Sequence, residues 1–178
     1  PGISPWMMRV KIVAMEAGYL CAVTPDDVTI EPCPLSDPDA AELIGELNEL
    51  LDSLYPPEDN HFTLLPDEVD GTNGLFLVAR DSGGRALGCG AVRLLGDGRA
   101  EIKRMYVRPS ARGRGIGKAI LSRLEAEAEL RGARALVLEM GADQPEARRL
   151  YESFGFRPIP CWGEYLATPA SVCLGKDL

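Results

Sequence analysis

The sequence predicts an α/β (α+β) domain with a mixed central sheet of about six to seven strands and about four flanking helices. Residues 100–130 read as a strand, a glycine-rich turn and a helix. A second buried strand, residues 135–140, follows that helix, and a crossover helix places it parallel to the first strand. Elsewhere strands follow one another through short turns at residues 81–84 and 96–98, which typically join antiparallel neighbours. Both kinds of strand pairing are therefore expected in one sheet.

The bulk composition fits one globular domain. The 178 residues are 46% hydrophobic and 26% charged, which is ordinary for such proteins. We expect residues 26–178 to form a single domain and residues 1–25 to be an extension whose order and native origin the sequence leaves open. No apolar run reaches the length of a membrane span. The net charge of −8 disfavours nucleic acid and anionic membranes as partners, while a cationic amine substrate and simple solubility explain it equally well.

The cysteines and the histidine limit the possible metal chemistry. Five cysteines are widely scattered without a C-x-x-C pair. We therefore expect reduced, mostly buried thiols in a cytoplasmic protein, with neither a disulfide framework nor a zinc site. His61 is the single histidine, which excludes a metal site built from several imidazoles of this chain. The sequence predicts no bound metal.

The first elements are a short strand and an amphipathic helix. Residues 28–31 favour a strand, which Pro32 ends. The segment 36–39 reads as a helix start, with Ser36 or Asp37 as the N-cap and a proline in the first turn. The apolar face of this helix comprises Ala40, Leu43, Ile44, Leu47, Leu50, Leu51 and Leu54.

Residues 55–74 show no sustained period and contain His61. A long irregular segment in a compact domain is often a lid or a binding loop. His61 then either caps a neighbouring group in a surface loop or contacts a substrate. Both interpretations stay open.

The middle of the chain is predicted to be a meander of three strands. Residues 75–79 and 86–95 form a hairpin, and a second turn leads into the central strand. The alternation of its residues predicts a strand whose two faces both make contacts. Ile102, Arg104 and Tyr106 lie on one side, and Glu101, Lys103, Met105 and Val107 lie on the other.

The turn after the central strand, Arg112-Gly113-Arg114-Gly115-Ile116-Gly117, predicts an anion site. Glycines let backbone N–H groups face outward, and the first N–H groups of the next helix have no intrahelical partner. With the helix dipole, these donors suit a phosphate. A Walker A loop needs a longer glycine spacing and a Ser or Thr after Lys118, and the Rossmann pattern needs a glycine at Lys118. Both nucleotide signatures fail.

The C-terminal elements alternate between helix and strand. A helix begins at residue 116, the strand 135–140 follows, a second helix begins at Pro145, and residues 171–174 form a final strand. The apolar helix positions are Ile116, Ile120, Leu121, Leu124 and Ala128, then Ala147, Leu150, Tyr151 and Phe154.

Two segments of this chain resemble a known family. Arg112-x-x-Gly115-x-Gly117, after a strand ending in Met105-Tyr106-Val107, resembles the central motif of the GNAT superfamily of N-acetyltransferases, which binds the pyrophosphate of acetyl-coenzyme A. Residues 147–156, ARRLYESFGF, resemble the family's second diagnostic segment. The order of elements from residue 28 onward is similar as well. Residues 163–172 resemble a small bacterial subgroup without a firmly assigned substrate.

The resemblance implies the GNAT fold, in which the two central parallel strands splay apart and admit the pantetheine arm of acetyl-CoA, the co-substrate. It also implies an oxyanion donor at the N–H of Tyr106 or Val107, and Tyr151 as the general acid. Tyr151 is otherwise explained as a core aromatic residue. The implied cofactor-binding residues are Met105, Tyr106, Val107, Arg112, Gly113, Arg114, Gly115, Ile116, Gly117, Lys118 and Gln144.

The function implied is acetyl transfer from acetyl-CoA to a primary amine of a small molecule or peptide, by direct attack in a ternary complex. The alternatives are a non-catalytic acyl-CoA sensor of the same fold and a nucleotide-binding module. Glu101 is the first candidate for the general base. Glu139 on the neighbouring strand is the second candidate and a candidate substrate contact. Either could also be a salt-bridged or solvated strand residue. A homodimer is compatible with the sequence.

Overall fold

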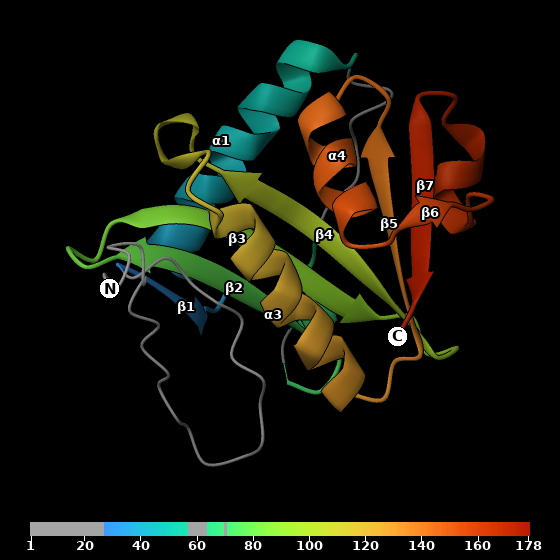
Figure 1. Cartoon of the computed structure of the whole chain (residues 1–178), viewed down its shortest axis with the longest axis horizontal. Helices are drawn as coiled ribbons and strands as arrows, with labels where there is room; N and C mark the ends of the chain where they lie inside the picture. Colours follow the sequence, from blue (N-terminus) through green and yellow to red (C-terminus); the bar gives the residue numbers. More distant parts are fainter. Residues whose placement is uncertain (1–26, 57–63, 70) are drawn as a thin grey trace, which may run out of the picture.

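The computed structural model describes residues 27–56, 64–69 and 71–178. The predicted extension, residues 1–25, and the candidate substrate contact His61 lie outside the described residues. The described chain forms one mixed sheet with helices on both faces (Figure 1). This confirms the predicted fold class.

The sheet has seven strands in the order β1-β2-β3-β4-β5-β7-β6. Within the described part of the chain, β4 and β5 form the one parallel pair, and all other neighbours are antiparallel. The crossover through a helix produces the parallel pair, as the sequence predicts. The strands are β1 (Val28–Pro32), β2 (Gly74–Asp81), β3 (Ala86–Leu94), β4 (Arg99–Val107), β5 (Ala135–Gly141), β6 (Arg157–Pro158) and β7 (Ser171–Asp177).

Four α-helices and two short 3-10 helices accompany the described strands. The carboxylate of Asp37 caps the first helix by accepting from the Asp39 N–H, at 2.9 Å. The four-residue helix after residue 65 and the two-residue β6 are too short to show a period, so the sequence does not predict them. The helices are α1 (Pro38–Leu54), α2 (Pro66–Val69), α3 (Ile116–Leu130), α4 (Pro145–Ser153), η2 (Pro109–Ala111) and η3 (Gly163–Ala167).

Two apolar cores lie on opposite faces of the sheet. The larger core packs α3 and α4 against the sheet, with Ile120, Leu124 and Phe156 fully buried. The smaller core packs α1 through Leu43 and Leu47 against Phe76. Helices α3 and α4 therefore share one face, and α1 covers the other.

The predicted alternation of β4 is wrong after residue 103, because the strand contains a β-bulge. The register with β3 shifts between Cys89 and Ala91, and Arg104 has a left-handed φ of 54°. After the bulge, Tyr106 joins the α1 core and Met105 packs toward the α3 core, the reverse of the expected sides. An inserted residue shifts the phase of every later side chain, and sequence periodicity does not register it.

The two parallel strands separate at the middle of the sheet. Pairing between β4 and β5 runs from Arg99 with Ala135 to Ile102 with Leu138. Beyond that point β4 stays with β3, while β5 follows β7 as far as Gly141. Figure 1 shows β4 and β5 diverging toward α1 and α4. The splay expected from the family resemblance is therefore present.

A disulfide between Cys161 and Cys173 corrects the expectation of wholly reduced thiols. The Ile159 N–H donates to the Cys173 carbonyl at 3.0 Å, so the chain leaving β6 runs beside β7. This places the two Cα atoms 5.2 Å apart, within the usual range for a disulfide. Cys33 and Cys89 are free and buried, as expected.

Candidate active site

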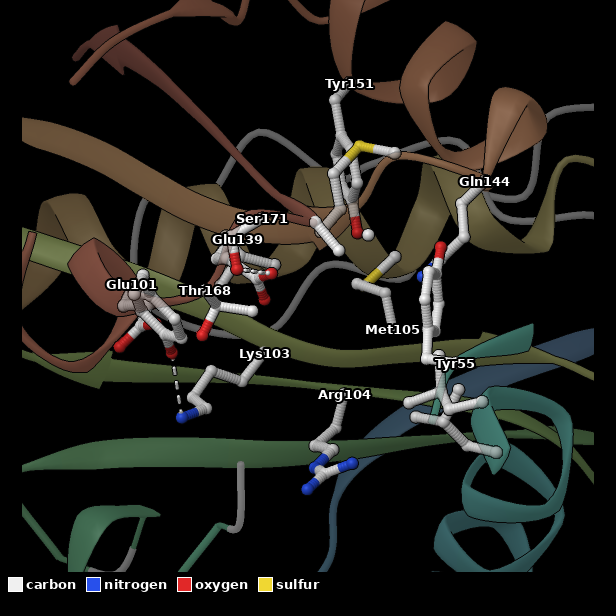
Figure 2. Close-up of a pocket in the computed structure, with 17 residues that line it drawn as sticks. Tyr55, Glu101, Lys103, Arg104, Met105, Glu139, Gln144, Tyr151, Thr168 and Ser171 are labelled. Carbon is white, nitrogen blue, oxygen red and sulfur yellow. Dashed lines mark hydrogen bonds between the residues drawn. The ribbon is translucent and has the colours of Figure 1, made fainter. Parts of the chain in front are cut away.

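A cleft opens where β4 and β5 separate (Figure 2). Its floor comes from these two strands, α1 and η3 supply its walls, and Tyr151 reaches it from α4. The segments of β4 and β5 that follow their last paired residues therefore line the same cleft. The lining residues on which the argument depends are Tyr55, Glu101, Lys103, Arg104, Met105, Glu139, Gln144, Tyr151, Tyr165 and Ser171.

Tyr151 presents its hydroxyl to the cleft. The residue is 7% exposed, and its ring packs edge-on against Phe156, with ring centroids 5.8 Å apart. Figure 2 shows the hydroxyl pointing between Met105 and Glu139. Burial raises the pKa of this phenol, and the neighbouring charge of Glu139 raises it further. Tyr151 therefore keeps its proton at neutral pH and can donate it.

Glu139 on β5 is a half-buried carboxylate in the same cleft. The Ser171 hydroxyl donates to its Oε1 atom at 2.7 Å. Burial raises the pKa of Glu139, although the Ser171 hydrogen bond opposes this. A carboxylate with a raised pKa is a stronger base than an exposed one.

Glu101 on β4 is 1% exposed and has two partners. The Arg93 Nε donates to its Oε2 at 2.6 Å, and the Tyr165 hydroxyl donates to its Oε1 at 2.5 Å. The Tyr165 oxygen in turn accepts from the Lys103 Nζ at 3.2 Å. Burial lowers the pKa of Lys103, and Glu101 partly compensates. Glu101 is thus the centre of a buried polar network.

Sequence reasoning missed Tyr165, Lys103 and Arg104 as residues of the cleft. Tyr165 lies on η3, a five-residue 3-10 helix in a segment without periodicity. Its one sequence signal is an aromatic residue after Gly163-Glu164 in an irregular segment. Lys103 and Arg104 resemble any charged strand residues until the bulge and the splay are known.

The glycine-rich turn leads into the N-terminus of α3, as predicted. Gly113 and Gly115 have left-handed φ values of 77° and 82°, and beyond their own chain neighbours no atom lies within 4 Å of where their Cβ atoms would be. The Ala119 N–H makes the bond to the Gly115 carbonyl, at 3.0 Å. The N–H groups of residues 116–118 precede this bond and have no acceptor within the helix. Open space beside amides that lack a helical acceptor fits a pyrophosphate.

The basic side chains of the turn are exposed. The Arg112 Nε donates to the Val107 carbonyl at 3.1 Å and so ties the turn to the end of β4. Arg114 pairs with Asp27 at 2.6 Å. Lys118 is exposed on the first turn of α3. All three basic residues belong to the turn or to the first turn of α3.

The remaining predicted residues divide between the cleft and the core. Met105 and Gln144 line the cleft. The Tyr106 side chain is buried against α1, and the Val107 side chain packs in the α3 core. Since both side chains are taken up by the cores, only the backbone groups of Tyr106 and Val107 are left for contacts with a ligand. The described residues hold no cluster of His, Cys, Asp and Glu suited to a metal ion, and none of their helices is long and apolar enough to span a membrane.

Comparison with known proteins gives consistent results. The model of the acetyltransferase (GNAT) family matches residues 42–156. An IAA acetyltransferase of Azospirillum brasilense is 41% identical over 150 residues, covering 82% of this chain and 94% of the relative. The uncharacterized N-acetyltransferase YsnE of Bacillus subtilis is 35% identical over 149 residues, covering 81% and 97%. A crystal structure from Klebsiella pneumoniae, named for acyl-CoA N-acyltransferase activity, superposes with a TM-score of 0.73 at 32% identity, covering 85% and 97%.

Proposed function

The chain belongs to the acetyltransferase (GNAT) family and is an acyltransferase, and we propose that it moves an acetyl group from acetyl-CoA to a primary amine of a small molecule or peptide. The attack is direct, in a ternary complex. The observation that carries the proposal is the Tyr151 hydroxyl pointing into the cleft between the separated strands β4 and β5 (Figure 2).

Acetyl-CoA fits two features of this chain. The open amides at the start of α3, with Arg112 and Lys118 beside them, suit its pyrophosphate. The edge of β4 that faces β5 loses its strand partner after Ile102. An amide-rich pantetheine arm can hydrogen-bond to that edge as an added strand. The backbone N–H of Tyr106 or Val107 would then hydrogen-bond to the thioester oxygen as it gains negative charge.

The reaction needs a proton donor and a proton acceptor, and we propose Tyr151 and Glu139 for these roles. The amine nitrogen forms a bond to the acetyl carbon and loses a proton, and the carbon–sulfur bond breaks to leave a thiolate. The Tyr151 hydroxyl, which its raised pKa keeps protonated, hydrogen-bonds to the departing sulfur and passes it a proton, and the proton that Glu139 takes from the amine then restores the tyrosine. Glu139 accepts the proton from the amine, directly or through water. It is favoured over Glu101, whose two oxygens already accept from Arg93 and Tyr165.

The thiols of the described residues support direct transfer. Cys89 is fully buried, and burial raises its pKa to about 12. A thiol is a good nucleophile only as the thiolate. Neither Cys89 nor Cys33 lines the cleft, so no acetyl-cysteine intermediate is proposed.

The test is steady-state kinetics of CoA release with acetyl-CoA and a panel of amines. Initial-rate lines at several amine concentrations should intersect, as a ternary complex requires. Tyr151→Phe should lower kcat by about a hundredfold, with acetyl-CoA affinity unchanged in calorimetry. Parallel lines would contradict direct attack. Acetyl-CoA binding without acetylation of any amine would favour a sensor.

A further inference from the structure

Two consecutive cations of β4, Lys103 and Arg104, line the same cleft. Neighbours on a regular strand point to opposite faces of the sheet. Here the bulge breaks that rule, because Arg104 takes a left-handed φ of 54°. A long charged residue rarely adopts this conformation, and such outliers gather at functional sites. The bulge therefore brings two positive charges to one wall of the cleft.

Contacts with other elements hold both cations in place. The Arg104 Nη1 donates to the Asn48 Oδ1 on α1 at 3.0 Å. The Lys103 Nζ donates to the Tyr165 hydroxyl on η3 at 3.2 Å. Burial lowers the pKa of both side chains, although a guanidinium keeps its charge at any physiological pH. The positive wall is therefore fixed by α1 on one side and by η3 on the other.

The carboxylates near the cleft do not occupy the positions of Lys103 and Arg104. Glu101 is engaged by Arg93 and Tyr165. Glu164 is half exposed, with an oxygen 3.9 Å from the Lys103 Nζ. Glu139 lies on β5 near Tyr151, and Figure 2 shows Lys103 and Arg104 on the opposite side of the cleft from the Tyr151 hydroxyl. The cleft thus has a proton acceptor at one side and two cations at the other.

We propose that the acceptor is a primary amine that also carries a carboxylate, as an α-amino acid does. This inference rests on the proposed acetyl transfer. The amine faces Glu139 and Tyr151, where the acetyl group arrives, and the carboxylate binds Arg104 and Lys103. Arg104 is the main determinant, because a guanidinium donates two parallel hydrogen bonds to a carboxylate and because Arg104 is the more exposed of the two. Leu47 and Leu51 of α1 line the same space and accommodate an apolar side chain.

The first experiment compares matched acceptors. Each amino acid is assayed beside its carboxamide, which keeps the amine and the side chain but loses the negative charge. The amide's amine releases its proton more readily, so chemistry alone favours the amide. We expect kcat/KM to be higher for the acids by on the order of ten- to a hundredfold, as for hydrogen bonds to charged groups. Equal or faster acetylation of the amides would overturn the proposal.

The second experiment changes the cation. Arg104→Gln should remove most of the preference for acids, so that kcat/KM falls much more for each acid than for its matched carboxamide. Arg104→Lys should restore part of the preference. Arg85→Gln is the matched control, because Arg85 is an exposed arginine in the turn between β2 and β3, away from the cleft lining. A preference for acids that survives Arg104→Gln would overturn the assignment.

Binding separates this inference from the proposed function. An amino acid that acts as acceptor is titrated calorimetrically into the complex of the enzyme with CoA. Acid binding that Arg104→Gln abolishes supports the charged subsite independently of turnover. Acetylation of uncharged amines without acid binding leaves the proposed function standing and overturns the acceptor class. Acetyl-CoA binding with no acetylation of any amine counts against the proposed function itself.

Discussion

At the scale of single residues, Glu139 should set the acid limb of the pH profile. Its pKa is raised by burial, and the base must be deprotonated to act. The rate should therefore fall with decreasing pH through a pKa above the usual carboxyl value of about 4.3. Glu139→Gln should remove this limb and lower kcat by about a hundredfold or more. The measurement is kcat/KM across the acid range.

Stability provides the control for that substitution. A carboxyl group with a raised folded-state pKa stabilises the fold below its unfolded pKa and loses this contribution as pH rises through the folded pKa. At neutral pH Glu139→Gln should therefore not lower the free energy of unfolding, since the amide oxygen still accepts from Ser171. A loss of activity accompanied by unfolding would count against the assignment. An acid limb that persists in Glu139→Gln would make Glu101 the preferred candidate for the general base.

Tyr165 should matter for stability more than an ordinary hydrogen-bonding tyrosine. Its hydroxyl donates to the buried Glu101 and accepts from Lys103. Tyr165→Phe removes one donor from a buried carboxylate, so we expect a loss of about 1–3 kcal/mol. Tyr55→Phe is the matched control, because its hydroxyl accepts from the neutral Asp143 N–H at 3.0 Å, and we expect about 0.5–1.5 kcal/mol. Urea denaturation measures both, and a smaller loss for Tyr165→Phe would contradict the network.

At the scale of elements, the two ends of α3 allow the phosphate site to be separated from the helix. Gly115 and Gly132 flank this helix with left-handed φ values of 82° and 83°, and neither has an atom near its missing Cβ. Substitution by alanine should cost about 1–2 kcal/mol of strain at either end. Gly115→Ala alone should also weaken acetyl-CoA binding, because it alters the amides of the N-terminus. Calorimetry with both variants tests this, and equal affinity in the two would argue against a phosphate site there.

Local backbone chemistry explains which elements the sequence predicts correctly. The Asp37 cap, the start of α4 at Pro145 and the glycine-rich turn before α3 all depend on neighbours within a few residues. The β4 bulge depends instead on the register with β3, and so the sides of Met105 and Tyr106 were predicted wrongly. The same register places Lys103 and Arg104 together in the cleft lining, which strand periodicity does not predict.

Contacts between distant segments explain the rest of what the sequence does not reveal. Tyr165 reaches Glu101 across 64 residues of chain. Cys161 meets Cys173 because β6 pairs with β7, and β6 is two residues long. Periodicity carries no signal for such short elements. The glycine-rich turn before α3 could therefore be predicted from a motif, whereas the cleft residues on β4 and η3 required the fold.

At the scale of the whole molecule, the Cys161–Cys173 disulfide should couple stability to acceptor binding. It fastens the segment that carries η3 and Tyr165 to β7. Cys161 and Cys173 are 12 residues apart in the sequence. Reducing a disulfide that closes so short a loop should lower the free energy of unfolding by about 2–3 kcal/mol. The glycine-rich turn belongs to a separate segment, before α3, and none of its residues is among those that line the cleft. Reduction should therefore raise KM for the acceptor more than KM for acetyl-CoA.

The experiment compares wild type with the Cys161→Ser, Cys173→Ser double variant, each with and without a phosphine reductant. Product is measured by mass spectrometry, since a thiol assay would respond to the reductant. Reduced wild type should match the double variant in stability and in acceptor KM, and the double variant should not respond to the reductant. The remaining described cysteines, Cys33 and Cys89, are buried and free, so they offer no second disulfide to open. An equal rise in both KM values would show that the bond supports the fold as a whole rather than the acceptor wall.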